Sequence, residues 1–330
     1  MPRGFWNELN KPFFALAPMA DVTDPTFRRI ISKYGKPDVM WTEFVSADGL
    51  FLGGRGAIIR DLDFTEDERP IVAQLFTSRP ELMKKAVELA RDMGFDGVDI
   101  NMGCPDRSIE KQGAGAVLMK NPNLAVELIK SAKAGAGDLP ISIKTRVGYN
   151  KDELDEWLPI LLSAEPSAIT IHARTRKQMS KEPADWNLVK RAVEIRDKME
   201  NTSASSQHST LIIGNGDVSD IKDARKKAKE SGADGVMFGR AIFGNPWLFD
   251  ENKKEITIEE RLKVLLEHTK LFEEIASHKN FSIMKKHFNA YVNGWPASKG
   301  RVSAKELRMK LMETSTASEA EKIINDYLKG

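Results

Sequence analysis

The feature that most constrains the fold of this 330-residue chain is a regular alternation of short, β-rich apolar runs with helical segments. The eight runs are Phe14–Ala17, Val39–Thr42, Ile71–Leu75, Gly97–Asn101, Ile141–Lys144, Ala168–His172, Leu211–Gly214 and Gly235–Phe238. The segment from Pro80 to Met93 is typical of what lies between them, since it has helical spacing, begins with proline and is followed by glycine. Eight strands, each followed by a helix, over about 250 residues predict a (β/α)8 TIM barrel.

After about residue 250 the β-rich runs stop and helical spacing continues. Four such segments follow: Ile258–Ala276, Ser282–Val292, Ser303–Met312 and Ser318–Leu328. We therefore predict an α/β barrel domain over residues 1–250 and a small all-α domain over residues 251–330. A doubly wound open sheet is the alternative. It would rarely need eight units, and no Gly-x-Gly-x-x-Gly turn follows the first run.

The helical tail carries a concentrated positive charge. Between Lys279 and Lys310 there are eight lysines or arginines and one acidic residue, Glu306. This basic block has a net charge of +7, so the rest of a chain with a net charge of +2 sums to −5. Such a block favours a polyanionic partner, although a solvated helix face would have the same composition.

Composition and cysteine usage indicate the cellular setting. The chain is 41% hydrophobic and 30% charged, which is typical of a soluble globular protein. Its single cysteine, Cys104, excludes a disulfide framework and fits a reducing compartment. The apolar run from Phe13 to Ala20 is too short to span a membrane and does not resemble a signal peptide. We expect a cytoplasmic monomer with no membrane partner and no stable protein partner.

Polar residues gather where the runs end. In a TIM barrel the C-terminal ends of the strands meet at one face, and that face carries the active site. The relevant ends are Ala17-Pro18-Met19-Ala20, Gln74, Asn101 with Cys104, Lys144-Thr145-Arg146, His172-Ala173-Arg174, Gly214-Asn215-Gly216-Asp217 and Gly239-Arg240. One Lys or His at a strand end is usually structural, but seven such ends on one predicted face indicate a site.

The last two ends suggest a phosphate site. Gly214-Asn215-Gly216 and Gly239-Arg240 supply exposed backbone amides and one cation, as loops after strands seven and eight of such barrels commonly do. A phosphate there and Lys144 across the barrel favour flavin mononucleotide (FMN), because a cation near the N1 and O2 edge stabilises the reduced ring. Gln74 suits the N3 and O4 edge, and His172 faces either the ring or the ribityl-phosphate chain. Two ordinary glycine turns are the alternative.

Cys104 follows the fourth run, in Met102-Gly103-Cys104-Pro105, where a strand passes into a loop. Gly113-Ala114-Gly115 would then allow backbone amides to approach a bound group closely. A cysteine in such a place is either an inert buried residue or a reactive thiol. The polar strand ends around Cys104 favour the reactive thiol.

Other titratable segments are predicted to have no role in the site. His268, His278 and His287 lack the spacing of a metal site, so we predict no metal and expect these residues on the surface. Asp61-Leu62-Asp63 and Glu66-Asp67-Glu68 are interpreted as a solvated loop after the second strand.

Together these motifs resemble the tRNA-dihydrouridine synthases. The resemblance covers residues 13–250 in register, and the helical tail fits the RNA-binding domain of that family more loosely. The matching elements are Ala17-Pro18-Met19-Ala20-Asp21-Val22-Thr23-Asp24, Gln74, Asn101-Met102-Gly103-Cys104-Pro105, Lys144-Thr145-Arg146, His172-Ala173-Arg174-Thr175, Gly214-Asn215-Gly216-Asp217 and Gly239-Arg240. The Asn-x-Gly-Cys-Pro element combined with the Lys and His strand ends is specific.

The resemblance implies an FMN-dependent oxidoreductase that reduces the C5=C6 bond of specific uridines in tRNA to 5,6-dihydrouridine, with NADPH as reductant. It implies that hydride passes from flavin N5 to C6 and that the Cys104 thiol, with an ordinary pKa near 8.5, donates a proton to C5. It implies that Asn101, Arg146 and Arg174 bind the substrate. The residues it assigns to FMN are Pro18, Met19, Gln74, Lys144, His172, Asn215, Gly216, Asp217, Gly239 and Arg240.

A target uridine must flip out of the tRNA fold to reach a barrel mouth, so such an enzyme needs a second, basic surface. We expect Lys285, Lys286 and Arg301 of the helical tail to contact tRNA phosphates there. One loop departs from the family pattern. Where members commonly have an aromatic residue and a glycine before Ala-Asp-Trp, this chain has Met179-Ser180-Lys181-Glu182-Pro183.

Two other functions fit part of the pattern. An FMN-dependent free-pyrimidine oxidoreductase of the dihydroorotate dehydrogenase type also pairs a lysine with FMN, but it has no reason to carry the basic block. An RNA-binding protein that kept the barrel and lost the chemistry would be free to lose Cys104, Lys144, His172 and Arg240.

Overall fold

A barrel of parallel strands forms the centre of the computed structural model, which describes residues 4–202, 209–293 and 303–329. The strands are hydrogen-bonded in the order β1-β8-β7-β6-β5-β4-β3-β2. They are β1 (Phe13–Leu16), β2 (Met40–Ser46), β3 (Ile71–Phe76), β4 (Gly97–Met102), β5 (Ile141–Arg146), β6 (Ala168–His172), β7 (Leu211–Asn215) and β8 (Gly235–Phe238). A parallel bridge between Ala15 and Val39 joins β1 to the residue before β2 and closes the barrel. The predicted fold class is confirmed.

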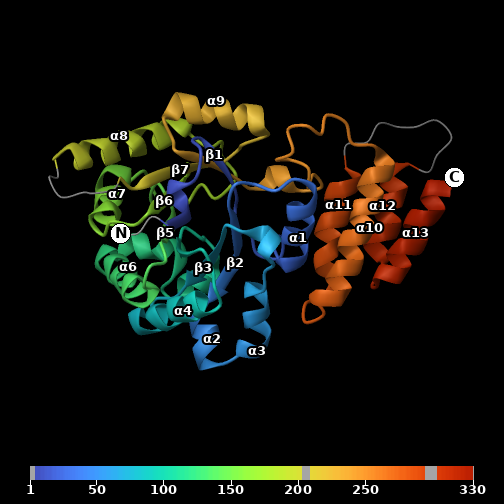
Figure 1. Cartoon of the computed structure of the whole chain (residues 1–330), viewed down its shortest axis with the longest axis horizontal. Helices are drawn as coiled ribbons and strands as arrows, with labels where there is room; N and C mark the ends of the chain where they lie inside the picture. The colour runs from blue at the N-terminus through green and yellow to red at the C-terminus, as the bar shows by residue number, and fades with distance from the viewer. Residues whose placement is uncertain (1–3, 203–208, 294–302, 330) are drawn as a thin grey trace.

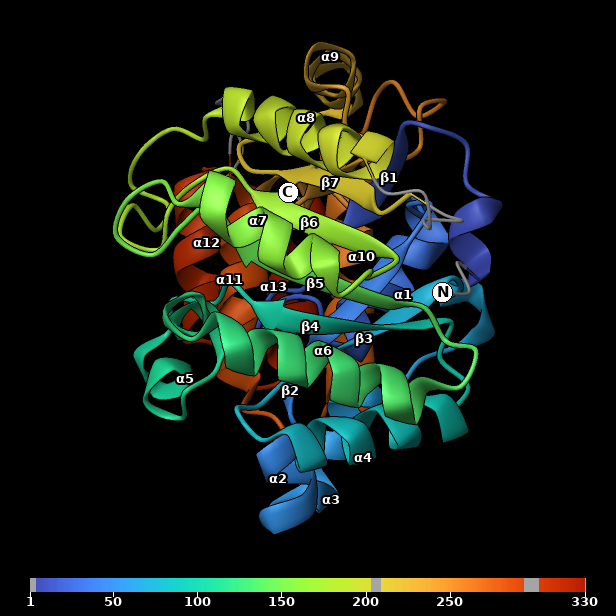
Figure 2. The same cartoon turned by 90° about the vertical axis from the view of Figure 1, so that its left-hand side faces the viewer.

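Helices cover the outside of the barrel and then form a separate group at one side (Figure 1). Those between the strands are α1 (Pro25–Tyr34), α2 (Ala47–Leu52), α3 (Arg55–Ile58), α4 (Pro80–Asp92), α5 (Arg107–Lys111), α6 (Pro122–Ala136), α7 (Leu154–Ser163), α8 (Trp186–Thr202) and α9 (Ile221–Ser231). Those after the barrel are α10 (Ile258–Ile275), α11 (Met284–Val292), α12 (Ala304–Glu313) and α13 (Ala317–Lys329). Figure 2 shows α6, α7 and α8 lying over the strands that they connect.

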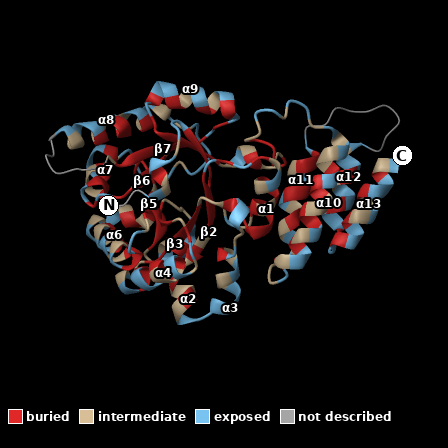
Figure 3. Cartoon of the chain, in the orientation of Figure 1, coloured by how far each residue is buried: buried red, intermediate tan, exposed pale blue. Residues whose placement is uncertain are grey.

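The interior of the barrel is filled at the N-terminal ends of the strands. Trp6, from a 3-10 turn before β1, packs against Phe13 and Trp41 with ring centroids 5.6 and 5.9 Å away. All three side chains are buried, and the strands are buried along their length (Figure 3). This end of the barrel is therefore closed, which leaves the C-terminal ends of the strands for a site.

One strand boundary differs from its prediction for an informative reason. The run Val39–Thr42 was expected to end before Glu43, but β2 continues to Ser46. Glu43 is only 5% exposed, and its carboxylate pairs with Lys279 of the helical part at 2.5 Å. A charged residue thus sits inside a strand because a distant lysine supplies its counter-charge.

The helical part packs on α1, which lies between the barrel and α10 and α11 (Figure 1). His268 stacks on Phe27 with ring centroids 5.0 Å apart, and His287 meets the same ring at 4.7 Å. The expectation that these histidines lie on the surface was wrong, because both are fully buried in this contact. His278 is also nearly covered, with a side chain 10% exposed beside Asp61. Burial lowers the pKa of His287 to about 4, so both rings are neutral at neutral pH.

Three of the five acidic residues after β2 are solvated as expected, but Asp61 and Glu68 are not. Glu68 is fully buried and accepts a hydrogen bond from the equally buried Arg28 at 2.7 Å. Asp61 pairs with Lys279 at 2.9 Å. Both carboxylates lie in short 3-10 turns. The turn with Glu68 packs on α1, the turn with Asp61 packs on β2 and α3, and each carboxylate pairs with a cation from another element.

Glu43, Asp61 and Lys279 therefore form a buried ion cluster between the barrel and the helical part. Burial raises the pKa of Glu43 to about 7, although Lys279 acts in the opposite direction. Burial lowers the pKa of Lys279, but the two carboxylates together raise it well above its ordinary value. The lysine is thus charged at neutral pH.

No helix in the described part of the chain is long and apolar enough to cross a membrane.

We expect Lys279→Met to lower the free energy of unfolding by about 3–5 kcal/mol, because it leaves the buried Glu43 and the partly buried Asp61 without their cation. Lys270→Ala is the matched control, since the pair of Lys270 with Glu321 joins α10 to α13 at 2.6 Å but is exposed. Its loss should stay below about 1 kcal/mol. Urea unfolding of the full chain measures both values, and equal losses would contradict the importance of the ion cluster.

Candidate active site

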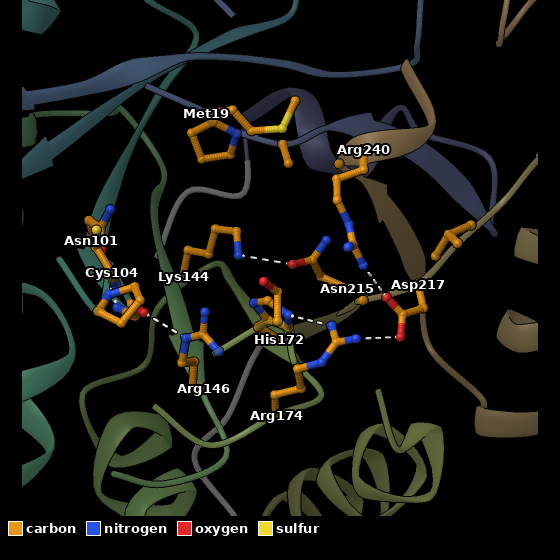
Figure 4. Close-up of a pocket in the computed structure, with 18 of the residues that line it drawn as sticks. Met19, Asn101, Cys104, Lys144, Arg146, His172, Arg174, Asn215, Asp217 and Arg240 are labelled. Atoms are coloured by element: carbon orange, nitrogen blue, oxygen red, sulfur yellow. Dashed lines mark hydrogen bonds and ion pairs between the residues drawn. The ribbon is translucent and has the colours of Figure 1, made fainter. Parts of the chain in front are cut away.

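A cavity of about 670 Å³ opens at the C-terminal ends of the strands. Its volume is typical of a site for a small molecule or cofactor. It brings together fourteen of the predicted residues: Pro18, Met19, Gln74, Asn101, Cys104, Lys144, Arg146, His172, Arg174, Asn215, Gly216, Asp217, Gly239 and Arg240. Figure 4 draws the side chains around the cavity and labels ten of these residues.

Cys104 lies on the loop after β4, and both of its backbone hydrogen-bonding groups are used. Its N–H donates to Asn101 Oδ1 at 2.9 Å, and its carbonyl accepts from Ala116 N–H at 2.9 Å. Gly115 has φ of +68°, and a Cβ there would come within 2.7 Å of the Cys104 carbonyl. Gly115 is therefore needed for packing against the cysteine loop itself, rather than for the close approach of a ligand that the sequence suggested.

The Cys104 thiol is protonated at neutral pH. Burial raises its pKa above the ordinary value, and the nearby cations of Arg146 and Lys144 only partly offset this effect. The free thiol in the cavity can therefore act as a proton donor.

Lys144 is on β5, the strand next to the one that precedes Cys104, and extends into the cavity (Figure 4). Its Nζ donates to Asn215 Oδ1 at 3.1 Å, and Asn215 Nδ2 in turn donates to the Met237 carbonyl at 2.8 Å. Burial, together with the charge of Arg146, lowers the pKa of Lys144 to about 8. Because this pKa lies close to neutral pH, an anionic ligand beside Lys144 would stabilise its charged form.

His172 and three charged residues form the opposite wall. A guanidinium can only donate, so the 3.1 Å contact from Arg174 Nη1 makes His172 Nε2 an acceptor and places the ring proton on Nδ1. Burial, and then the surrounding cations, lower the pKa of His172 well below its ordinary value. Asp217 pairs with both Arg174 and Arg240, and the hydrogen bond from Arg174 is the main reason why the pKa of Asp217 falls to about 2.

Arg146 joins the cysteine loop to a second loop that overhangs the cavity. Its Nε donates to the Gly103 carbonyl at 2.8 Å, and its Nη1 donates to the carbonyls of Thr175 and Met179 at 3.1 and 2.9 Å. These bonds occupy Nε and Nη1, so Nη2 is the nitrogen that remains for a ligand. Arg146 thus connects the two loops by hydrogen bonds and also lines the cavity.

The overhanging loop contains the stretch that departs from the family pattern. Met179 has φ of +54°, and Ser180 lines the cavity. An ion pair between Arg176 and Glu110 ties this loop to α5 on the far side of Cys104. The sequence analysis found the unusual stretch but did not predict that Ser180 faces the site.

Some predicted residues lie elsewhere, and some cavity residues were not predicted. Lys285 and Lys286 are on α11, where Lys286 pairs with Asp21 at 3.2 Å. Arg301 falls outside the described residues. Phe44 lines the cavity although its strand was expected to end earlier. No cluster of three or more His, Cys, Asp or Glu suited to a metal occurs within residues 4–202, 209–293 and 303–329.

Comparison with known proteins gives a consistent match along the chain. Residues 15–329 match the family model described as dihydrouridine synthase. A probable tRNA-dihydrouridine synthase from Staphylococcus aureus (strain MRSA252) is 38% identical over 99% of this chain and 96% of its own length. Probable tRNA-dihydrouridine synthase 2 from Bacillus subtilis (strain 168) is also 38% identical, over 99% of this chain and 97% of its own length.

Solved structures support the fold alone. Histamine dehydrogenase from Rhizobium sp. 4-9 aligns with a TM-score of 0.52 and 13% identity, over 78% of this chain and 48% of its own. A 2-naphthoyl-CoA reductase aligns with a TM-score of 0.50 and 11% identity, over 73% of this chain and 49% of its own.

The pKa of Cys104 can be measured directly, because it is the only cysteine. We expect the rate of its alkylation by iodoacetamide to rise with pH to a midpoint above the value of about 8.5 for a free thiol. Lys144→Met should move the midpoint further up, because it removes a cation that stabilises the thiolate. Lys226→Met, on the exposed face of α9, is the control and should leave it unchanged. A midpoint below 8.5 in the wild type would show that the cations outweigh burial.

Proposed function

Because the chain belongs to the dihydrouridine synthase family, we propose that it is a tRNA-dihydrouridine synthase, which reduces the C5=C6 bond of specific uridines in tRNA. The observation that carries this proposal is the pairing of a protonated, half-buried Cys104 with a cluster of cations in one cavity. A thiol can protonate C5, and cations can hold an anionic cofactor and stabilise developing negative charge.

We propose FMN as the cofactor and NADPH as the electron donor. The phosphate would be held by Arg240 and by the backbone of Gly216 and Gly239. A Cβ at Gly239 would meet only Met19 Sδ, at 3.9 Å, so the loop leaves room for a group to approach. The Arg240 side chain is 66% exposed at the rim and bonds Asp217, which orients it. These features fit a phosphate monoester.

The remaining cofactor contacts would come from the walls of the cavity. Lys144 would face the N1 and O2 edge of the flavin, and Gln74 the N3 and O4 edge. Pro18 and Met19, on the loop after β1, would pack against the ring. When bound and reduced by NADPH, FMN supplies the hydride that goes to C6 of the uracil.

The proton comes from the chain itself. Cys104 Sγ–H donates its proton to C5, so that hydride and proton together saturate the C5=C6 bond, and the resulting thiolate takes a proton from solvent. Asn101 and Arg146 hold the uracil carbonyls, where negative charge develops. Arg174 contributes a further positive charge beside the base.

The helical part, residues 251–330, would bind the body of the tRNA beside the barrel of residues 1–250. Lys285, Lys286 and Arg301 are the proposed phosphate contacts. Lys279 belongs to the same basic block, but the ion cluster already uses it, so it is not among them. The target uridine leaves its stack to reach the cavity.

The reaction is tested by incubating unmodified tRNA with the protein, FMN and NADPH and measuring dihydrouridine by mass spectrometry. We expect product from the wild type, and at least about a hundredfold less from Cys104→Ala and Cys104→Ser, because alanine has no proton to donate and the serine hydroxyl is far too weak an acid. Retained flavin absorbance in both variants would show that they still fold. No product from wild type with bound flavin, on unmodified or native tRNA, would overturn the tRNA assignment and favour a free pyrimidine as substrate.

The phosphate site is tested by comparing FMN with riboflavin, which lacks the phosphate. We expect Arg240→Ala to weaken FMN binding about tenfold to a hundredfold, the equivalent of one charge-assisted hydrogen bond of about 1.5–3 kcal/mol. Riboflavin binding should change little. Arg225→Ala is the matched control, because Arg225 lies on the exposed face of α9 and also pairs with a carboxylate, that of Glu251. It should affect the binding of neither ligand. Fluorescence quenching measures all six constants, for the wild type and the two variants with each ligand. An equal loss for both ligands in Arg240→Ala would contradict a phosphate contact.

A further inference from the structure

We propose that Asp99, a carboxylate below the cavity floor, is a positioning residue that fixes the orientation of the Gln74 amide, and with it the donors that Gln74 and Asn101 offer to ligands. The inference rests on the proposed function. Asp99 is fully buried on β4, between Gln74 on β3 and Ser142 on β5. It does not line the cavity, and the sequence analysis assigned it no role.

The hydrogen bonds around Asp99 run in one direction. Its Oδ2 accepts from Gln74 Nε2 at 2.6 Å, and its Oδ1 accepts from Ser142 Oγ at 2.6 Å. An ionised carboxylate only accepts, so Gln74 must turn its nitrogen toward Asp99 and its oxygen away from it. Burial raises the pKa of Asp99 to about 6, which still leaves it ionised at neutral pH.

The hydrogen bonds at the Asn101 end of this network require the same orientation of the Gln74 amide. Gln74 Oε1 accepts from Asn101 Nδ2 at 3.0 Å. Asn101 Oδ1 accepts from the backbone N–H groups of Gly103 and Cys104, at 3.1 and 2.9 Å. Backbone amides only donate, so neither side-chain amide can turn over without leaving buried donors face to face.

The consequence is a defined pattern of donors at the cavity. The side-chain oxygen of Asn101 already accepts hydrogen bonds from the cysteine loop, so the group that remains available to a ligand is an N–H of Nδ2. Gln74 likewise retains one N–H of Nε2 and one lone pair of Oε1. An N–H at Asn101 suits a carbonyl oxygen of uracil and opposes the amino group of cytosine. The acceptor-only Asp99 holds the middle amide, Gln74, in the orientation that this pattern needs.

The test is FMN affinity, because Gln74 is the proposed contact to the N3 and O4 edge of the flavin. The charge of Asp99 also raises the pKa of Lys144, an effect that does not pass through Gln74. Asp99→Asn keeps the shape but offers one acceptor and one donor, so the orientation of Gln74 then depends on its hydrogen bond with Asn101 alone. We expect it to weaken FMN binding about fivefold, and Asp99→Leu, which offers neither, about twentyfold. Ser142→Ala is the matched control, since it removes the other hydrogen bond of the same carboxylate. It should change FMN binding by less than about twofold.

A double-mutant cycle separates positioning from general damage to the barrel. In a Gln74→Ala background, Asp99→Asn should weaken FMN binding by a clearly smaller factor than in the wild type, since there is no amide left to orient and only the charge near Lys144 changes. The same factor in both backgrounds, or no effect of Asp99→Asn in the wild type, would overturn the proposal. Should Asp99→Leu fail to fold, Asp99→Asn carries the cycle alone. A wild type that binds no flavin at all would instead contradict the proposed function.

Discussion

The parallel register of the central strands is the constraint on which the cavity depends. Across neighbouring strands it pairs Asn101 with Lys144, Arg146 with His172, and His172 with Asn215. Side chains alternate between the barrel interior and the helix layer, so a shift of one residue in a single strand would remove its functional group from the cavity. Because Trp6 and Trp41 fill the other end of the barrel, the same register leaves only one end where these groups can meet a ligand.

The charges of the cavity meet two opposing requirements. Cations are needed for an anionic ligand, yet every cation near Cys104 favours the thiolate and works against a proton donor. The structure separates the two needs in space. Asp217 lies between Arg174 and Arg240 and neutralises part of their charge on the wall formed by the ends of β6, β7 and β8. Cys104 follows β4, away from this wall, and burial has the larger effect on its pKa.

The strands and most of the cavity residues could be predicted because they follow from local periodicity and from one rule about barrels. Ala168–His172 and Gly235–Phe238 were observed as predicted. The errors arose where a partner distant in the sequence decides the environment. His268 and His287 are polar residues on amphipathic helices, and only the packing of Phe27 against them explains their burial. Asp99 is similar, since its acceptor role depends on donors from two other strands.

Glu43 connects the cavity to the helical part through a single carboxylate. Its Oε1 accepts from the backbone N–H of Asp21 at 2.5 Å, in the same loop as the cavity residues Pro18 and Met19. Its Oε2 pairs with Lys279 at 2.5 Å. The loop after β1 that lines the cavity and the helical part are thus bonded to the same buried carboxylate, in addition to being joined by the chain itself. For a tRNA bound on the helical part, the uridine itself must still move out of its stack to reach the cavity.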